Sequence, residues 1–343
     1  MINSNNKTVL EEKMKVLLRK KIAGSLTAVA LLIGAGVNLA HAKVELVSSD
    51  TVNPSNDRAK LLDTVFKSCL GDGFDFKAYH SATLFKQGTE LNAMQRGNLD
   101  MAPVAIPDLY NQVPESSILS AAYLYRDYNH MRKVWASGVL DDLLATIQKK
   151  ARIKVLTNVY IGTRQVNLKG NKVIKTPADL AGVKLRMPGG EVWQFIGEAL
   201  GANPTPVAFT EVYTALQTGA VDGQDNPFTG TKVMKFYEVT DQIVLTNHLV
   251  ANNLFSIAQS TWDKLNASQQ AKVQECAIKY RDAWEAVVSA QDSSLRGFFE
   301  KEGLKVYDPD REAFRKHVQK KYMASKYAKD WPAGLVEKIN AVK

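Results

Sequence analysis

Apolar residues recur with two different periods in the chain from residue 43 onward. Three segments have the alternation or composition of β-strands: residues 43–50, 74–81 and 100–107. The stretches between them, 53–70 and 90–99, place apolar residues at helical spacing, and the second is expected to end at Gly97. Asn56 is suited to cap the first helix. Strand, helix, strand, helix, strand predicts an α/β unit with a parallel sheet.

The same order recurs in the middle of the chain. Strand patterns at 153–161, 163–168 and 183–187 precede a helical pattern at 191–201. The run Thr176-Pro177-Ala178-Asp179 resembles a capping box with proline at the first helical position. The middle of the chain therefore predicts a second α/β lobe.

Residues 210–227 combine an amphipathic stretch with a very polar one. Val212 and Leu216 fall on one helical face, and Gly219 suits the left-handed position after a helix. We expect a polar turn to follow. Pro227 should then hold Asn226 in extended conformation, with both the donor and the acceptor of its amide available. Without further information the segment could equally be a polar surface loop.

Residues 261–303 carry apolar positions at three- and four-residue spacing over an unusual length. A helix of that length can bridge two lobes. We detect no internal repeat and no Gly/Ser-rich linker, so we expect crossing strands to join the lobes. The predicted fold is α/β and two-lobed.

The first 42 residues are typical of an export signal. Basic residues precede the apolar run from Ile22 to Leu39, which ends in Ala40-His41-Ala42, an A-x-A cleavage pattern. The alternative is a membrane anchor, because the apolar run is close to spanning length. We expect the mature chain to begin near Lys43 and to work in the periplasm.

Removing that segment changes the charge of the chain. The whole sequence has 44 Lys/Arg and 35 Asp/Glu, and residues 1–42 hold six and two of them, which leaves 38 and 33 and a formal charge of +5 instead of +9. This modest excess without a dense basic block suits a small anionic ligand, and we expect no nucleic-acid partner.

The two cysteines, Cys69 and Cys276, lie far apart in the sequence. In an oxidising compartment they could form one disulfide. Two buried thiols are the alternative, because sequence does not test disulfide geometry.

The sequence offers little sign of catalysis. The histidines after residue 42 do not occur at metal-ligand spacing, and no G-x-S-x-G elbow, phosphate loop or complete dinucleotide motif is present there. We expect neither an enzyme nor a cofactor or metal. A site assembled in space from distant residues stays open at this point.

Arg186 has a suggestive position. The period of two in "GVKLRMPGG" puts Lys184 and Arg186 on one face of a strand that ends at a Pro-Gly-Gly turn. A guanidinium at a strand end can grip a carboxylate with two parallel N–H···O bonds, and ligands collect at strand ends in α/β folds. An ordinary solvated arginine is the alternative.

Three long motifs carry a resemblance to a known family: "ADLAGVKLRMP", "LGANPTPVAFTEVYTALQTGAVDGQDNP" and "KFYEVTDQIVLTNH". In this order the sequence is similar to DctP-type solute-binding proteins of tripartite ATP-independent periplasmic (TRAP) transporters. The resemblance extends over nearly the whole chain after residue 42. It implies two lobes around a ligand cleft, a long helix across both lobes, and closure by hinge motion.

The resemblance also implies a ligand site. Arg186 matches the family arginine that forms a salt bridge with the ligand carboxylate, and Arg164 matches a second arginine in the preceding strand. Asn226 and Phe209 match the asparagine of "D-G-Q-x-N-P" and the aromatic residue of "P-x-A-F/W-x-E-V-Y".

Departures from better-known members affect the expected ligand. In sialic-acid-binding relatives an acidic residue reaches the cleft near the position of Ala105, and Gly189 replaces a frequent asparagine. Sialic acid is therefore not the ligand we expect. Other groups must contact the polar part of the ligand, and each candidate could equally be structural: Asp50, Thr51, Gln87, Trp193 and Tyr213.

The resulting prediction is a monomeric periplasmic protein that captures a small organic acid, such as a sugar acid or dicarboxylate. It should deliver this ligand to the small and large membrane subunits of a TRAP transporter. We expect lobe I to comprise residues 43–162 and 252–292, and lobe II residues 163–251 and 293–343. A secreted enzyme and the ligand-binding partner of a sensor are the competing classes.

Overall fold

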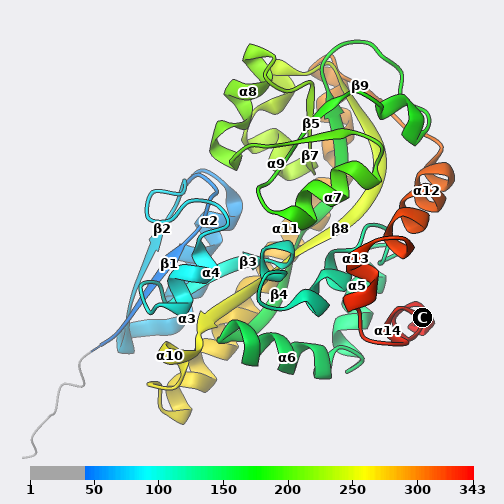
Figure 1. Cartoon of the computed structure of the whole chain (residues 1–343). Helices are drawn as coiled ribbons and strands as arrows, with labels where there is room; N and C mark the ends of the chain where they lie inside the picture. The colour runs from blue at the N-terminus through cyan, green and yellow to red at the C-terminus, as the bar shows by residue number, and fades with distance from the viewer. Residues whose placement is uncertain (1–42) are drawn as a thin grey trace, which may run out of the picture. The chain divides into compact units, whose positions relative to one another are not determined.

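The computed structural model describes residues 43–343. The predicted export signal lies outside these residues. Nine strands of the described part belong to one mixed sheet, with helices packed around it (Figure 1). The strands are β1 Val44–Ser49, β2 Phe74–Tyr79, β3 Met101–Ala105, β4 Ile153–Leu168, β5 Lys184–Met187, β6 Asn203–Pro206, β7 Gly223–Pro227, β8 Gln242–Ala258 and β9 Lys305–Tyr307.

The helices vary from a single turn to ten turns. They are α2 Asp57–Leu61, α3 Ser68–Leu70, α4 Glu90–Gln95, α5 Tyr128–Ala136, α6 Asp141–Ala151, α7 Glu191–Ala199, α8 Val212–Thr218, α9 Phe228–Val233, α10 Gln259–Trp262, α11 Ala267–Lys301, α12 Arg311–Met323, α13 Lys326–Asp330 and α14 Leu335–Ala341. Short 3-10 or π segments connect several of them, including the π-helical turn Leu62–Lys67 between α2 and α3. None of the helices within residues 43–343 combines the length and apolarity needed to cross a membrane.

The sheet has parallel ends and an antiparallel middle. Its order is β2-β1-β3-β8-β4-β7-β5-β6, with β9 beside β8. Pairing is parallel among β2, β1 and β3 and among β7, β5 and β6, as the βαβ pattern predicted. The parallel prediction is wrong for the centre, where β8 runs antiparallel to β3 and β4 and β4 runs antiparallel to β7.

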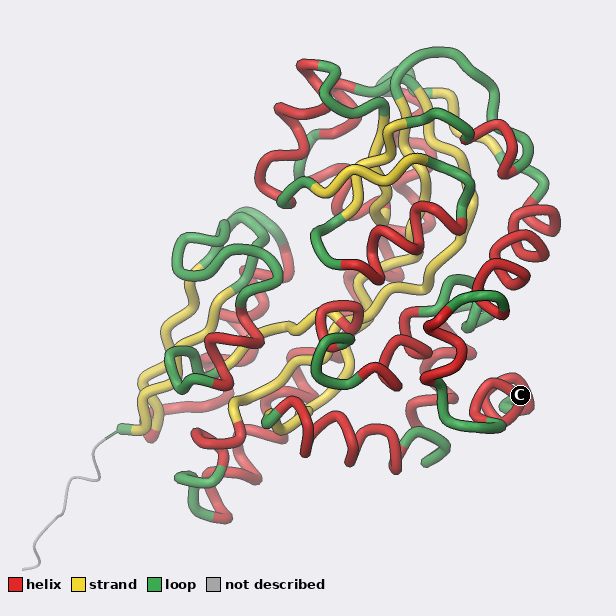
Figure 2. The backbone as a smooth tube through the Cα atoms, viewed as in Figure 1, coloured by secondary structure: helices red, strands yellow, loops and turns green. Residues whose placement is uncertain are grey.

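Two long strands connect the parallel ends, as the absence of a flexible linker predicted. β4 has 16 residues and β8 has 17, and they pair along most of their length (Figure 2). The segments 153–161 and 163–168, predicted as two strands, are one strand. β4 has three register shifts relative to β8, at Val155/Thr157, Tyr160/Gly162 and Arg164/Val166. These are β-bulges, which bend a strand without ending it.

Local helix signals in the sequence are reproduced in the structure. Asn56 caps α2, and its Oδ1 accepts from the N–H of Arg58 at 2.8 Å. Thr176 and Asp179 form the predicted capping box. Helix α8 ends at Gly219, which has φ +75°.

The polar stretch after α8 differs from its prediction. The turn is confined to residues 219–222, and residues 223–227 form β7, a fully buried strand between β4 and β5. Asn226 is extended, as Pro227 predicted. The polar composition of β7 is unusual for a buried strand. Its polar side chains form hydrogen bonds inside the fold instead of packing as an apolar layer.

Helix α11 spans 35 residues and begins with a capping box at Asn266 and Gln269. It contacts α2 and β4 toward one end of the sheet and α9 and β9 toward the other, so the prediction of a long bridging helix is confirmed. A disulfide joins Cys69 of α3 to Cys276 of α11, with the Cα atoms 5.5 Å apart. The proposed assignment of residues to lobes I and II stays a prediction.

The disulfide should contribute substantially to stability, because it closes a loop across 207 residues of sequence. We expect the double variant Cys69→Ala/Cys276→Ala to lower the free energy of unfolding by about 2–4 kcal/mol. Urea denaturation of the purified secreted protein measures this change. Wild-type protein unfolded without reductant should show no titratable thiol, and two titratable thiols there would contradict the bridge.

Candidate functional site

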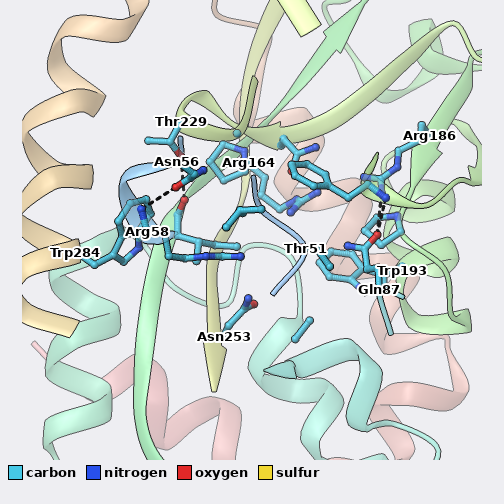
Figure 3. A pocket seen from close by; sticks show the side chains of 18 residues that line it. Thr51, Asn56, Arg58, Gln87, Arg164, Arg186, Trp193, Thr229, Asn253 and Trp284 are labelled. Carbon is cyan, nitrogen blue, oxygen red and sulfur yellow. Dashed lines mark hydrogen bonds between the residues drawn. The ribbon is translucent and has the colours of Figure 1, made fainter. Parts of the chain in front are cut away.

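One cavity collects residues from the carboxyl ends of several parallel strands (Figure 3). Thr51 follows β1, Ala105 ends β3, Pro188 follows β5 and Asn226 lies near the end of β7. Within each group of parallel strands the carboxyl ends lie at one edge, where ligands bind in open α/β sheets. The two groups run in opposite directions, so β3 and β7 both end beside the middle of the long strands, at Asn253 of β8 and Arg164 of β4. The topology thus assembles this cavity from segments up to 233 residues apart, from Thr51 to Trp284.

Arg186 is the most unusual residue of this cavity. Its side chain is fully buried, with Nε donating to the carbonyl oxygen of Val207 at 2.8 Å and Nη2 donating to Oε1 of Gln87 at 3.3 Å. Nη1 has no hydrogen-bond partner among residues 43–343. Burial, together with the nearby positive charge of Arg164, lowers the pKa of Arg186 to about 9, although Asp225 opposes the shift.

Arg164 of β4 also lines the cavity, but its charge is already paired. Its Nε donates to Oδ2 of Asp225 at 2.6 Å, and its Nη2 donates to Oδ1 of the same residue at 2.8 Å. Nη1 is not part of this bidentate contact. The guanidinium also lies 5.0 Å from the ring centroid of Trp193.

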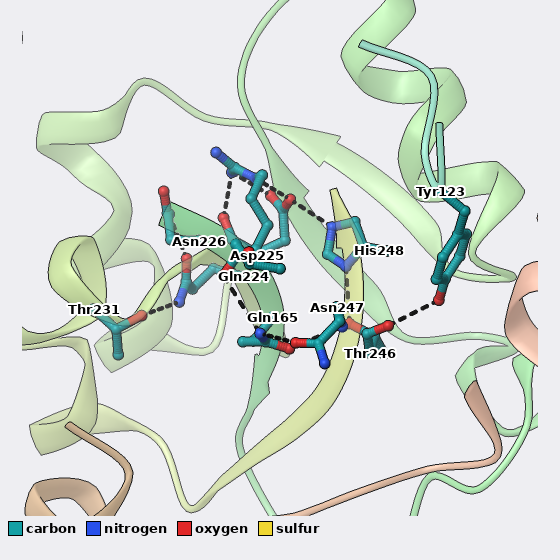
Figure 4. A network of polar contacts seen from close by, with 11 residues as sticks. Tyr123, Gln165, Gln224, Asp225, Asn226, Thr231, Thr246, Asn247 and His248 are labelled. Carbon is teal, nitrogen blue, oxygen red and sulfur yellow. Dashed lines mark hydrogen bonds and ion pairs between the residues drawn. The ribbon is translucent and has the colours of Figure 1, made fainter. Parts of the chain in front are cut away.

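Asp225 connects Arg164 to a buried histidine. His248 Nε2 lies 3.2 Å from Asp225 Oδ2, and its Nδ1 lies 2.8 Å from Oγ1 of Thr246 (Figure 4). Burial would raise the pKa of Asp225, but Arg164 and His248 outweigh it and hold that pKa well below its usual range. Burial also lowers the pKa of His248, against the attraction of Asp225. Asp225 therefore stays ionised beside Arg164 inside the sheet.

The other side chains of β7 continue this network. Asn226 Nδ2 donates to Oε1 of Gln224 at 2.5 Å, and Gln224 Nε2 donates to Oγ1 of Thr231 at 3.3 Å (Figure 4). Gln224 Nε2 also donates to Oδ1 of Asn167 at 3.1 Å. A buried polar network of this kind fixes side-chain orientation when its members are satisfied. Asn226 is consequently held in one orientation beside the cavity.

Gly162 allows this part of the site to form. It has φ +114° and lies at a register shift of β4, and a Cβ atom there would come within 2.5 Å of Cβ of Pro227. Only glycine tolerates both the backbone conformation and the approach. The close packing of β4 on Pro227 sets the position of the neighbouring Asn226.

The structure brings most of the candidate residues together. The predicted residues that line the cavity are Arg186, Arg164, Asn226, Phe209, Thr51, Gln87 and Trp193. Phe209 presents its ring 6.0 Å from the Arg186 guanidinium, and Gln87 Oε1 accepts from the Phe209 N–H at 2.9 Å. Ala105, expected where some relatives carry an acid, also lines the cavity.

Asp50 and Tyr213 have different surroundings. Asp50 lines an adjoining cavity, and its carboxylate receives two hydrogen bonds from the buried guanidinium of Arg58. Tyr213 is absent from the lining of either cavity, and its hydroxyl donates to Oε2 of Glu238 at 3.0 Å. The structure therefore does not bring Tyr213 together with the other candidates.

Sequence reasoning missed several residues of the cavity: Asn56, Arg58, Thr229, Asn253 and Trp284. Asn253 could have been found, because Asn252-Asn253 interrupts the apolar run of β8. Arg58 gave a weaker signal, an arginine just after a helix N-cap. Trp284 is placed by α11, where its Nε1 donates to the carbonyl oxygen of Tyr160 at 2.7 Å.

The adjoining cavity has an acidic wall. Asp108 accepts from Nε1 of Trp193 at 3.1 Å, and burial raises its pKa to about 6. Burial raises the pKa of Glu90 to about 7, and the negative charges of Asp108 and Asp50 add to the shift. No group of three or more His, Cys, Asp or Glu side chains that could hold a metal ion occurs in the described part.

This fold and site define a class of protein, a two-lobed binding protein whose strand ends surround a cationic cavity. The chain belongs to the bacterial extracellular solute-binding protein family 7, DctP, whose model matches residues 48–330. The predicted relationship to TRAP solute-binding proteins is thereby confirmed. These proteins are periplasmic and act in solute transport.

Several characterised relatives are similar over most of their length. The sialic acid-binding periplasmic protein SiaP of Vibrio cholerae is 34% identical over 271 residues, 78% of this chain and 82% of that protein. A Roseobacter denitrificans TRAP protein with bound 3-deoxy-D-manno-oct-2-ulosonic acid (KDO) is 41% identical, with TM-score 0.85 over 88% of this chain and 100% of that one. Another from the same organism, with bound L-galactonate, is 27% identical, with TM-score 0.79 over 87% and 99%.

Glu90 should make stability depend on pH. The folded protein retains a proton on Glu90 up to about pH 7, so the free energy of unfolding should fall as pH rises from 5 to 8. In Glu90→Gln this fall should be smaller, by on the order of 1 kcal/mol after allowing for partial exposure of the side chain. Urea denaturation at both pH values measures the difference. The exposed Glu337→Gln serves as control, and identical pH dependence in both variants would contradict the assignment.

Proposed function

We propose that this chain is the periplasmic solute-binding subunit of a TRAP transporter, that it captures a sugar acid, and that it delivers this ligand to the small and large membrane subunits. We infer the class of ligand mainly from the burial and hydrogen bonding of Arg186. Its guanidinium is fully buried, its Nη1 has no hydrogen-bond partner, and none of the carboxylates in the described part is ion-paired with it. The described residues therefore do not neutralise the charge of Arg186. A ligand carboxylate supplies both the missing charge and the missing acceptor.

The surrounding residues support this role for Arg186. Val207 and Gln87 fix the guanidinium by accepting from Nε and Nη2, which leaves Nη1 for the ligand. Asp225 neutralises Arg164, so the two arginines can lie in the same cavity without an uncompensated repulsion. We assign Nη1 of Arg164 as a second donor to the carboxylate.

Asn226 and Phe209 complete the proposed carboxylate end. The Asn226 amide is oriented by Gln224, which occupies one of its donors and leaves its carbonyl oxygen for a ligand hydroxyl. Phe209 provides an apolar wall next to Arg186. These four residues bind and orient, and the proposed function contains no bond-making step.

The relatives point toward sugar acids. The ligands named for them are sialic acid, KDO and L-galactonate, all of which combine one carboxylate with several hydroxyl groups. The family resemblance implies an acidic side chain near the position of Ala105 in sialic-acid-binding relatives, and Ala105 lines the cavity here, so sialic acid itself is not the ligand we propose. KDO is the first ligand to test because the protein that holds it is 41% identical to this chain.

Removing the cation should abolish most of the affinity. We expect Arg186→Ala to weaken binding of KDO by more than 100-fold, because it leaves the ligand carboxylate unpaired in a desolvated site. Arg186→Lys should recover only part of the affinity, since a single ammonium group cannot keep the contacts to Val207 and Gln87 and also reach the ligand. Isothermal titration of refolded, ligand-free protein measures these values.

The matched control is Arg315→Ala, which removes an exposed arginine from α12. This variant should bind like wild type. Unchanged affinity in a folded Arg186→Ala protein would rule out the proposed carboxylate contact. Failure of wild type to bind any organic acid would rule out the proposed ligand class.

A further inference from the structure

The adjoining cavity, which we name the acidic chamber, lies next to the candidate site. The two share five lining residues: Thr51, Arg58, Gln87, Ala105 and Asn253. Gln87 marks the boundary on one side, because it lines both and its Oε1 accepts from Arg186. A molecule bound to Arg186 that extends past Gln87 therefore enters the acidic chamber.

The two ends of this combined cavity differ in charge. The arginine end is built by β4, β5 and β7, and the opposite end by β1, β3 and the segment that leads into α4. In the acidic chamber, Arg58 is ion-paired with Asp50. Among the described residues that line it, Glu90 and Asp108 then remain without a cationic partner.

We propose that the acidic chamber is the subsite for the tail of the ligand and that it selects hydrogen-bond donors, so that this protein takes a long polyhydroxy monocarboxylate and rejects a dicarboxylate. This inference rests on the proposed function, because it takes the Arg186 end as the anchor of the carboxylate. The class of ligand is a sugar acid whose carbon chain reaches from Arg186 past Gln87.

The lining chemistry determines which tail fits. Carboxylate oxygens accept hydrogen bonds, and hydroxyl groups can donate to them. Asp108 is fixed in orientation by Trp193 Nε1, so its carboxylate has a defined direction. Gly88 lies beside Asp108, and a Cβ atom added to Gly88 would be 3.9 Å from Asp108 Oδ2. The backbone of Gly88 has φ +83°, a conformation that disfavours any other residue at this position.

The same lining excludes a second carboxylate. A dicarboxylate anchored on Arg186 would bring its other charge toward Asp108, and toward Glu90 at a pH high enough to ionise that side chain, and like charges that share a desolvated site repel strongly. Burial raises the pKa of both groups because each is costly to ionise away from water, even though Trp193 donates a hydrogen bond to Asp108. Ligand hydroxyl groups would reduce that cost. A short hydroxy acid would bind at Arg186 and leave the acidic chamber unfilled.

The first experiment uses wild-type protein and a series of ligands. Refolded, ligand-free protein is titrated with D-erythronate, L-galactonate, KDO and succinate by calorimetry. Affinity should increase with chain length across the three hydroxy acids, and KDO should bind at least tenfold more tightly than succinate. Equal affinity for KDO and succinate, or no gain with chain length, would overturn the subsite.

The second experiment is run at pH 8, where both side chains of the wild type are ionised, and uses the nearly isosteric neutral variants Asp108→Asn and Glu90→Gln. Each should reduce the ratio of KDO to succinate affinity by about tenfold, because a neutral amide accepts hydroxyl groups less strongly and no longer repels a carboxylate. Glu337→Gln is the control and should leave the ratio unchanged. Folded variants with an unaltered ratio would overturn the inference.

These outcomes separate the two proposals. If acids bind through Arg186 but discrimination does not depend on Asp108 or Glu90, only the subsite is wrong. If wild type binds none of the four acids, the proposed function and the inference fail together. Thermal unfolding of each variant establishes that a changed ratio comes from folded protein.

Discussion

The site depends on keeping a guanidinium ionised inside a sheet without a protein carboxylate attached to it. Arg186 is 0% exposed, and the segments around it supply only the neutral acceptors Val207 and Gln87. A second arginine nearby would make this arrangement unfavourable if it were not neutralised. Asp225 neutralises Arg164 through two charge-assisted hydrogen bonds, and His248 accompanies the same carboxylate. The polar strand β7 is thus part of the electrostatic balance of the cavity.

That balance explains why β7 is a buried strand of unusual composition. Its residues Gln224, Asp225 and Asn226 meet partners from β4, β8 and α9, so the hydrogen-bonding capacity of this short strand is largely satisfied inside the fold. An apolar strand in the same place could pack equally well, but it would leave Arg164 as an unpaired buried charge. Fold and site are therefore set by the same residues here.

Local features could be predicted from the sequence, whereas features that depend on distant partners could not. Asn56, the capping box at Thr176 and Gly219 act within a few residues of the backbone that they cap, and each was found where it was expected. The ion pair of Arg164 joins residues 61 positions apart, and no local pattern indicates it. The antiparallel centre of the sheet was not predicted from the sequence, because this centre depends on the insertion of β8 between β3 and β4. The repeated order of strands and helices does not indicate which strands are neighbours.

The candidate residues show the same limit. Arg186 was found from its place at a strand end, but the lack of a partner for its Nη1 became visible only in the structure. Arg58 and Asn253 reach the cavity because α2 and β8 are folded against it. Tyr213 was one of the candidates for the polar part of the ligand, yet its hydroxyl on α8 donates to Glu238.

The bulges of β4 have a mechanical consequence. A single sheet runs through the described part without a linker, so any change in the angle between its parallel ends must be absorbed by β4 and β8. A regular ladder resists bending because each step would strain a pair of hydrogen bonds. The three register shifts, one of them at Gly162, are places where that ladder is already interrupted, and bending there strains fewer hydrogen bonds. Closure over a ligand, which the family resemblance implies, would therefore bend β4 and β8 at these interrupted positions.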